Sequence, residues 1–568
     1  MTEEPPLTER RAGSPATTLR PREAFDGNGR PAAERTPSQR LRLVAIAAVA
    51  VVVGAWLIFV IRQIADAGFY SDDWALQWEW HHYGFSDALE RQFDILGSKP
   101  LLAILLIGSY QVLGTDPTAH HVVAALLTLG CTVAFYFVIR GLRFPARDAI
   151  PIALLALLFP WASSVRLWPT GALNNVAILL LLAGFLIALR GLRVEGGRGL
   201  LIHVAATGCY VASILTYEVT TAVALFAWTA YVWLGGWRRA LPRMALDVPV
   251  IAAAAIYTSE NTNKHITSLG DQLAHIPDLV GDGAKLIAGT FLPVAVPAEL
   301  APALTVIVIG AAIAILALAA LRARALSRAK ATGGIRWPIV ALAALGALAL
   351  CWAVYIPQAF YTPTFRGIED RVNILALYPA AVLVWAVFRS AGAVLPRNGY
   401  ALAAAGAAAV AIGFGIQDFR QQDQWLRSTE LQPTVLAAVE RANTNEGNVV
   451  LVFNYPGEVA PRVPILNVNY DLLPAARLVT SKDIDTYPVF EGSTVRCSPK
   501  GVAIDWLATP LYERIWLAEE HTAKLQPYGN VVMVDVGRHR DQLIGSREQC
   551  ARALATYRPG TWRIGSGS

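Results

Sequence analysis

Residues 171–198 read GALNNVAILLLLAGFLIALRGLRVEGGR. The part before Arg190 carries no charge, and as a helix rising about 1.5 Å per residue it can cross a hydrocarbon core of about 30 Å. Arg190, Arg193 and Arg198 follow immediately. An apolar run that ends in clustered arginines is typical of a transmembrane helix whose arginine-rich end faces the cytoplasm.

The rest of the chain repeats this pattern, and its composition agrees with a membrane protein. Of the 568 residues, 55% are hydrophobic and 16% are charged, and the mean hydropathy is +0.43. The net charge is +6, and the arginines lie in short loops between apolar runs. This distribution indicates a lipid bilayer as the partner, and no nucleic acid. About eleven crossings are predicted, at residues 43–61, 119–139, 149–164, 171–189, 200–216, 219–236, 245–258, 301–321, 337–357, 372–388 and 399–416. The fold class predicted is therefore an α-helical polytopic membrane protein.

Arginines crowd every second loop, which predicts the orientation of the chain. They place the N-terminus in the cytoplasm and residues 62–118, a large first loop, outside. The run 101–112 is too short to span, and counting it as a crossing would invert this pattern, so it is predicted to lie in the interface. Residues 1–40 are predicted to be a disordered cytoplasmic tail, and residues 41–418 the transmembrane domain.

Residues 419–568 are far less apolar and are predicted to form an extracytoplasmic α/β domain. The strand-like runs 448–453 and 531–536 support this assignment. Cys497 and Cys550 lie in this domain, where oxidation is permitted, and the preferred prediction is a disulfide between them. The cysteines in the apolar runs are read as small core residues, and no cysteine spacing resembles a zinc site.

Two adjacent carboxylates, Asp72 and Asp73, stand just beyond the first apolar run. A charge beside a bilayer is costly unless it is solvated, paired or used, so this pair is a candidate functional site. The alternative is that the two acids only end a helix and lie in water.

Further motifs follow the acidic pair in order along the chain. They are Lys99-Pro100-Leu101, His120-His121, Phe159-Pro160-Trp161 with Arg166-Leu167-Trp168, Tyr217-Glu218, and Glu369-Asp370-Arg371 before Tyr378-Pro379. This series resembles the GT-C superfamily of polyprenyl-phosphate-dependent glycosyltransferases, in the branch of the protein O-mannosyltransferases and the transmembrane tetratricopeptide-repeat mannosyltransferases. The resemblance covers about residues 41–390, and no tetratricopeptide repeats follow.

The resemblance implies roles for these residues in sugar transfer. Asp72 or Asp73 would take the proton of the acceptor. Cations would stabilise the departing phosphate, and the candidates are Arg371, Arg366, Arg166 and Lys99. Glu218, Glu369 and Asp370 would bind the acceptor or serve structure.

Several alternatives stay open for these side chains. Arg371 could anchor its helix or pair with Glu369 or Asp370, and Lys99 could only reach toward the interface. A divalent metal, Mg or Mn, could be held by the acidic pair with Asp370 or Glu369, and metal dependence is left open.

The function predicted is a membrane glycosyltransferase, inverting, that moves a sugar from a polyprenyl-phosphate donor to a cell-wall glycan, lipid or protein acceptor outside the cell. A polytopic transporter or flippase is one alternative, although the sequence shows no internal repeat. A polysaccharide polymerase or ligase for lipid-linked glycans is the other. Abundant alanine, arginine and glycine with few lysines favour the plasma membrane of a bacterium.

Overall fold

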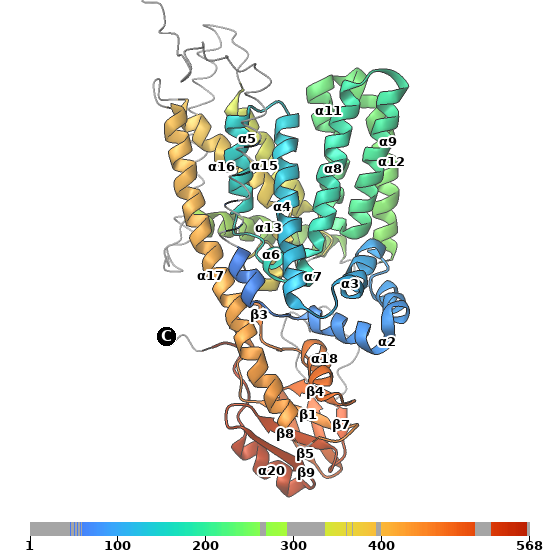
Figure 1. Cartoon of the computed structure of the whole chain (residues 1–568), viewed down its shortest axis with the longest axis vertical. Helices are drawn as coiled ribbons and strands as arrows, with labels where there is room; N and C mark the ends of the chain where they lie inside the picture. The colour runs from blue at the N-terminus through green and yellow to red at the C-terminus, as the bar shows by residue number, and fades with distance from the viewer. Residues whose placement is uncertain are drawn as a thin grey trace, which may run out of the picture. The chain divides into compact units, whose positions relative to one another are not determined.

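A run of long apolar helices leads into a small domain with β-sheet in the computed structural model (Figure 1). The structure describes residues 60–261, 268–291, 335–358, 361–365, 367–393, 399–442, 444–505 and 524–564, and a few single positions before residue 60. Some predictions therefore fall outside the described residues: the tail 1–40, the span 301–321 and Arg366. The predicted span 43–61 lies almost entirely outside them.

The helices between the acidic pair and the sheet domain follow one another in chain order. They are α2 (Asp72–Ile95), α3 (Pro100–Leu113), α4 (Pro117–Gly141), α5 (Ala146–Leu157), α6 (Ser164–Leu167), α7 (Pro169–Ala172), α8 (Asn174–Arg193), α9 (Gly196–Thr216), η1 (Glu218–Thr220), α10 (Thr221–Phe226), α11 (Trp228–Gly235), α12 (Trp237–Glu260), α13 (Leu269–Phe291), α15 (Trp337–Ala353), η2 (Gly367–Asn373), α16 (Leu377–Gly392) and α17 (Gly399–Arg441). Local sequence sets several of their ends. The Asp116 carboxylate accepts a hydrogen bond from the Thr118 N–H at 3.0 Å and caps α4, with Pro117 in the first turn.

Five of the described helices are long and apolar enough to cross a membrane. They are α4, the stretch Pro169–Arg193 formed by α7 and α8, then α9, α12 and α17. A sixth crossing results if η2 and α16, which are bent by 68° relative to each other, count as one broken span. The structure is that of a helical membrane protein, but the prediction of about eleven crossings was wrong.

Two of the eleven predicted spans, 43–61 and 301–321, lie outside the described residues or almost entirely so, and others are apolar runs that do not form one long helix. The predicted span 149–164 is only α5, which has 12 residues and contains Pro151. The predicted span 219–236 begins in the 3-10 turn η1 and continues as the short helices α10 and α11, of 6 and 8 residues, which meet at Ala227. Hydropathy records the apolar character of such runs, but it does not register where their hydrogen-bonded helix is interrupted.

The predicted boundary between residues 418 and 419 lies inside α17, which runs as one helix for 43 residues. Figure 1 shows α17 extending from the apolar helices to the sheet domain, and both belong to one compact unit that starts at residue 49. The first strand begins only at Val449. The sheet domain is therefore joined to the helices by continuous helical backbone.

The sheet domain contains the two strands that the sequence predicted. Its elements are β1 (Val449–Phe453), β2 (Glu458–Ala460), β3 (Val463–Pro464), α18 (Asn469–Thr480), β4 (Asp485–Pro488), β5 (Thr494–Ser498), β6 (Gly501–Asp505), β7 (Lys524–Gln526), β8 (Val531–Asp535), β9 (Arg540–Ile544) and α20 (Arg547–Thr556). The main sheet has the order β4-β1-β8-β9, in which β1 runs parallel to β4 and β8, and β9 runs antiparallel to β8.

Both faces of the main sheet are covered. The strands β1 and β8 are buried throughout, as expected for strands with a core on each side. The end of α17 and α18 pack on one face, in a core that includes Val439 and Leu472. On the other side, Cys497 of β5 and Cys550 of α20 form a disulfide with their Cα atoms 5.8 Å apart.

Candidate functional site

The turn before α2 separates the two acids of the pair. Asp73 is fully buried, and its carboxylate accepts hydrogen bonds from the Tyr70 N–H and the Thr170 N–H, each at 2.9 Å, and from the Thr170 hydroxyl. The Tyr110 hydroxyl donates to the Asp73 carbonyl oxygen at 2.9 Å. Asp73 thus fastens the turn, in which Ser71 has a positive φ of 46°, to two other helices.

Burial raises the pKa of Asp73 to about 7, although its hydrogen bonds oppose that rise. A carboxylate that is enclosed and accepts three hydrogen bonds has little room for a substrate. Asp73 thus holds the turn that carries Asp72.

Asp72 is the accessible member of the pair. It is half-buried at the first position of α2, and the hydroxyl of Ser71 lies 3.4 Å from its carboxylate. Burial raises the pKa of Asp72, and the positive charge of Arg371 opposes that rise. Residues about 300 positions apart in the sequence thus act on each other electrostatically.

Arg371 is held above a buried aromatic ring. Its guanidinium carbon lies 5.7 Å from the ring centroid of Trp168. The indole N–H of Trp168 donates to the Tyr70 carbonyl oxygen at 3.1 Å, in the turn that presents Asp72. Trp168 therefore links the arginine to the acidic turn.

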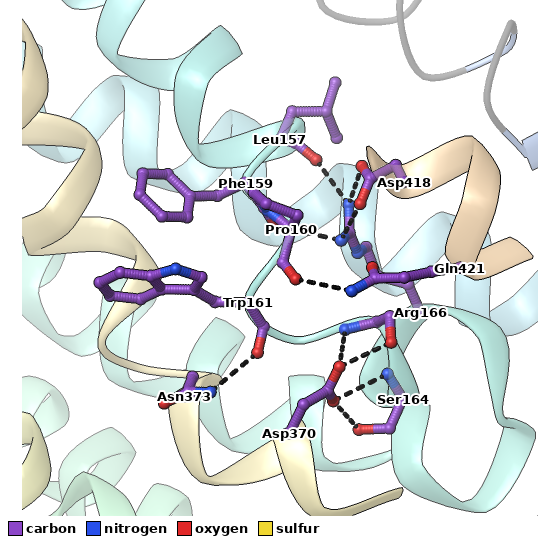
Figure 2. Close-up of polar contacts among 11 residues, drawn as sticks. Leu157, Phe159, Pro160, Trp161, Ser164, Arg166, Asp370, Asn373, Asp418 and Gln421 are labelled. Atoms are coloured by element: carbon purple, nitrogen blue, oxygen red, sulfur yellow. Dashed lines mark hydrogen bonds and ion pairs between the residues drawn. The ribbon is translucent and has the colours of Figure 1, made fainter. Parts of the chain in front are cut away.

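Asp370 anchors the short helix η2 that carries Arg371. Its carboxylate accepts four hydrogen bonds, from the backbone N–H and the hydroxyl of both Ser163 and Ser164, at 2.5 to 3.0 Å (Figure 2). In the same view, the Asn373 amide donates to the Trp161 carbonyl oxygen at 3.0 Å. These contacts support the structural alternative for Asp370, because both carboxylate oxygens are engaged.

Arg166 has protein partners on its whole guanidinium edge. Its two terminal nitrogens form a bidentate ion pair with Asp418 at 2.7 Å each, and they also donate to the carbonyl oxygens of Leu157 and Phe159 at 3.0 Å (Figure 2). The side chains of Arg166 and Asp418 are 14% and 9% exposed. The structure thus joins Arg166 to Asp418 of α17.

Lys99 and Glu218 form an ion pair of 3.0 Å. The Lys99 ammonium also lies 4.8 Å from the ring centroid of Tyr217. Burial raises the pKa of Tyr217, and the charges of Lys99 and Arg371 oppose that rise. Tyr217 therefore lies within electrostatic range of both Lys99 and Arg371.

Glu369 faces the sheet domain. Its carboxylate lies 2.9 Å from the guanidinium of Arg462, and the neighbouring Ile368 N–H donates to the Arg462 carbonyl oxygen at 2.9 Å. A cavity of about 330 Å³ borders Glu369 and Val372 and is also lined by Lys285 of α13. The three successive residues 369–371 thus have three separate sets of neighbours.

Metal binding finds no support in the part of the chain that the structure describes. There, no three histidine, cysteine, aspartate or glutamate side chains are arranged to hold an ion. The Nε2 atoms of His120 and His121 instead lie within hydrogen-bond distance of the carbonyl oxygens of Gly114 and Gly68, each at 3.0 Å.

Three polar side chains near these residues were not selected from the sequence. Asp418 could have been noticed as a lone acid just after the predicted span 399–416. Tyr470 and Asp471 belong to α18, and the Tyr470 hydroxyl lies 3.0 Å from that of Ser71. In the sequence, Tyr470 and Asp471 are distinguished only by lying between two strand-like runs. The sequence does not indicate that they contact the first loop.

No protein-family model matches this chain, and no curated protein sequence matches it. The resemblance to GT-C glycosyltransferases accordingly stays a prediction from the order of the motifs.

Proposed function

We propose that this protein is a membrane glycosyltransferase of the GT-C type, which moves a sugar from a polyprenyl-phosphate donor to an acceptor hydroxyl. The observation that carries the proposal is that Asp72 lies within electrostatic range of Arg371, which Trp168 holds near the turn of the acidic pair. An accessible carboxylate and a fixed guanidinium are the two groups that such a transfer needs. The proposed setting is the outer face of a bacterial plasma membrane.

In this mechanism, Asp72 accepts the proton of the acceptor hydroxyl while the hydroxyl oxygen attacks the anomeric carbon of the donor. The bond between that carbon and the phosphate oxygen breaks, and the electron pair stays on the phosphate. Arg371 stabilises the charge that develops there, because a guanidinium matches phosphate geometry with fixed donors. Attack opposite the leaving phosphate inverts the anomeric centre.

The surrounding residues have supporting parts in this proposal. Asp73 holds the turn of Asp72, and Asp370 holds the helix of Arg371. Lys99 adds positive charge near the phosphate but is already paired with Glu218. No step requires a metal, and no set of ligands for one was found among the described residues.

A transporter is the competing proposal, and one intramembrane pair has the chemistry for it. His203 of α9 lies 3.0 Å from the carboxylate of Asp247 in α12, and the Thr207 hydroxyl donates to the same carboxylate at 2.6 Å. All three side chains are buried. These contacts favour a structural link between two helices over an ion pathway.

The test is a transfer assay with purified full-length protein in liposomes and radiolabelled polyprenyl-phosphate mannose, glucose or arabinose. We expect Asp72→Asn to lower kcat by about 10² to 10⁴, the usual worth of a general base. Asp87→Asn is the matched control, because Asp87 is an exposed acid on the same helix. Wild-type turnover by Asp72→Asn would refute the assignment of the base.

For the cation, Arg371→Ala is compared with Arg371→Lys and with Arg427→Ala, an exposed arginine of α17. We expect Arg371→Ala to lose most activity and Arg371→Lys to recover part of it, because lysine keeps the charge but not the planar donors. Unchanged activity in Arg371→Ala would contradict its role at the phosphate.

A further inference from the structure

The cavity beside η2 is lined by three separate segments of the chain. Its volume of about 330 Å³ falls within the range of about 300 to 1,000 Å³ that is usual for ligand pockets. The lining comes from Asp282 and Lys285 of α13, from residues 361–365, and from Glu369 and Val372 of η2. No step of the mechanism proposed above uses this cavity.

The segment 361–365 is held in place from two sides. The Nε2 atom of His275 in α13 lies 3.1 Å from the Tyr361 carbonyl oxygen, and the Asn373 amide donates to the Thr364 carbonyl oxygen at 2.8 Å. The ring centroids of Tyr361 and Tyr355 are 5.7 Å apart. A ligand therefore meets a side of the cavity that is already ordered and loses little free energy in ordering it.

The polar groups of the lining are reachable and suit the hydroxyl groups of a sugar. The side chains of Asp282 and Glu369 are 31% and 18% exposed, and Thr362 and Phe365 are half-buried. Carboxylates accept strong hydrogen bonds from hydroxyl groups, and a threonine hydroxyl both donates and accepts. The apolar C–H face of a sugar ring packs well against an aromatic ring such as that of Phe365.

The charges of the lining are balanced in pairs, which favours a neutral ligand. Lys285 is the only cationic side chain among the described lining residues, and its ammonium lies 2.8 Å from the Asp282 carboxylate. The Glu369 carboxylate lies 2.9 Å from the guanidinium of Arg462. A phosphate would meet two carboxylates and would have to compete with Asp282 for Lys285.

The cavity borders the same short helix that carries the proposed phosphate-binding arginine. Glu369 and Val372 are three positions apart in the 3-10 helix η2, so they lie on the same side of it and face the cavity together. Arg371 lies on another side, near Trp168. A sugar in the cavity would thus lie within one helical turn of Arg371 along the chain.

We propose that this cavity binds a neutral saccharide unit, whose hydroxyl groups donate to Asp282 and Glu369 and whose ring packs on Phe365. The inference rests on the proposed glycosyl transfer and deepens it, because the saccharide is the sugar of the donor or a unit of an acceptor glycan. Both sources present the same hydroxyl-rich ring. The two arms of the test distinguish them.

The first arm measures binding without turnover, by saturation-transfer NMR of methyl mannoside, glucoside and arabinoside with the full-length protein in nanodiscs. We expect Asp282→Asn to raise the Kd about tenfold, because an amide oxygen accepts a weaker hydrogen bond than a carboxylate. Phe365→Leu should raise it about fivefold through loss of the aromatic face. Asp278→Asn is the matched control, since Asp278 is an exposed acid one turn earlier on α13.

The second arm measures the KM of donor and acceptor for the same variants in the liposome transfer assay. A rise in the donor KM alone assigns the saccharide to the donor, and a rise in the acceptor KM alone assigns it to the acceptor. Unfolding temperatures of all variants show whether the fold is retained.

The inference and the proposed function fail in different ways. Wild-type Kd and KM values in folded Asp282→Asn and Phe365→Leu, together with an inactive Asp72→Asn, would overturn the saccharide site and leave the transfer standing. Glycoside binding that these two changes weaken, in a protein that turns over no donor, would leave the site standing without the transfer. Tighter binding of mannose 6-phosphate than of methyl mannoside would overturn the assignment to a neutral ligand.

Discussion

Replacing Arg166 by methionine should destabilise the protein strongly, independently of any substrate. The change leaves the Asp418 carboxylate, which is only 9% exposed, without the two hydrogen bonds of 2.7 Å that now neutralise it. Removing one partner of a buried ion pair costs about 3 to 5 kcal/mol, because the remaining charge stays desolvated. The carbonyl oxygens of Leu157 and Phe159 also lose a donor, at about 1 to 3 kcal/mol each where no water replaces it.

The pair is best measured by a double-mutant cycle in mixed detergent micelles, with tryptophan fluorescence as the signal of unfolding. We expect Arg166→Met and Asp418→Leu to be destabilising singly, and the double variant to recover about 3 kcal/mol because no unpaired charge remains. Wild-type stability in Arg166→Met, combined with a raised donor KM, would refute this reasoning. That result would instead favour Arg166 as a residue that binds the donor phosphate.

Three further outcomes follow from buried or crowded positions. The raised pKa of Asp73 favours its neutral form in the folded state. The free energy of unfolding should therefore fall by on the order of 4 kcal/mol as the pH rises from 3.8 to about 7. The Asp73→Asn variant should show a flatter pH dependence in unfolding titrations. Loss of the disulfide in the Cys497→Ala, Cys550→Ala variant, which opens a separation of 53 residues, should cost about 4 kcal/mol, and an unfolding temperature unaffected by dithiothreitol in the wild type would contradict this. Gly367→Ala should lower both stability and transfer, since its Cβ would collide with the Arg462 carbonyl oxygen, whereas Gly281→Ala, with open space around it, should be tolerated in the same assays.

The candidate site was predictable as a set of residues but not as an arrangement. The acids, Arg371 and Lys99 were all chosen from motifs. Their partners came from distant parts of the chain: Arg166 meets Asp418, 252 positions away. Sequence spacing contains no information about such contacts, because they depend on how the helices pack.

The acidic pair shows the same limit at close range. Two adjacent aspartates at a helix start look equivalent in the sequence. In the structure, Asp73 is enclosed by Thr170 and Tyr70, whereas Asp72 is partly open and faces Arg371. Adjacent residues of a helix point about 100° apart, so packing on one side separates their roles.

The sequence by itself determined that this is a helical membrane protein with a small α/β domain after it, and where two of the strands lie. Apolar length and strand patterning are local properties, and local properties can be read along the chain. Only the tertiary structure decided how many of the described apolar runs form helices long enough to span, since α5 and the successive short helices α10 and α11 look the same as long helices in hydropathy. It also decided that α18 lies against the acidic turn, about 400 positions away in the sequence, because burial of Trp74 against the sheet domain unites the two.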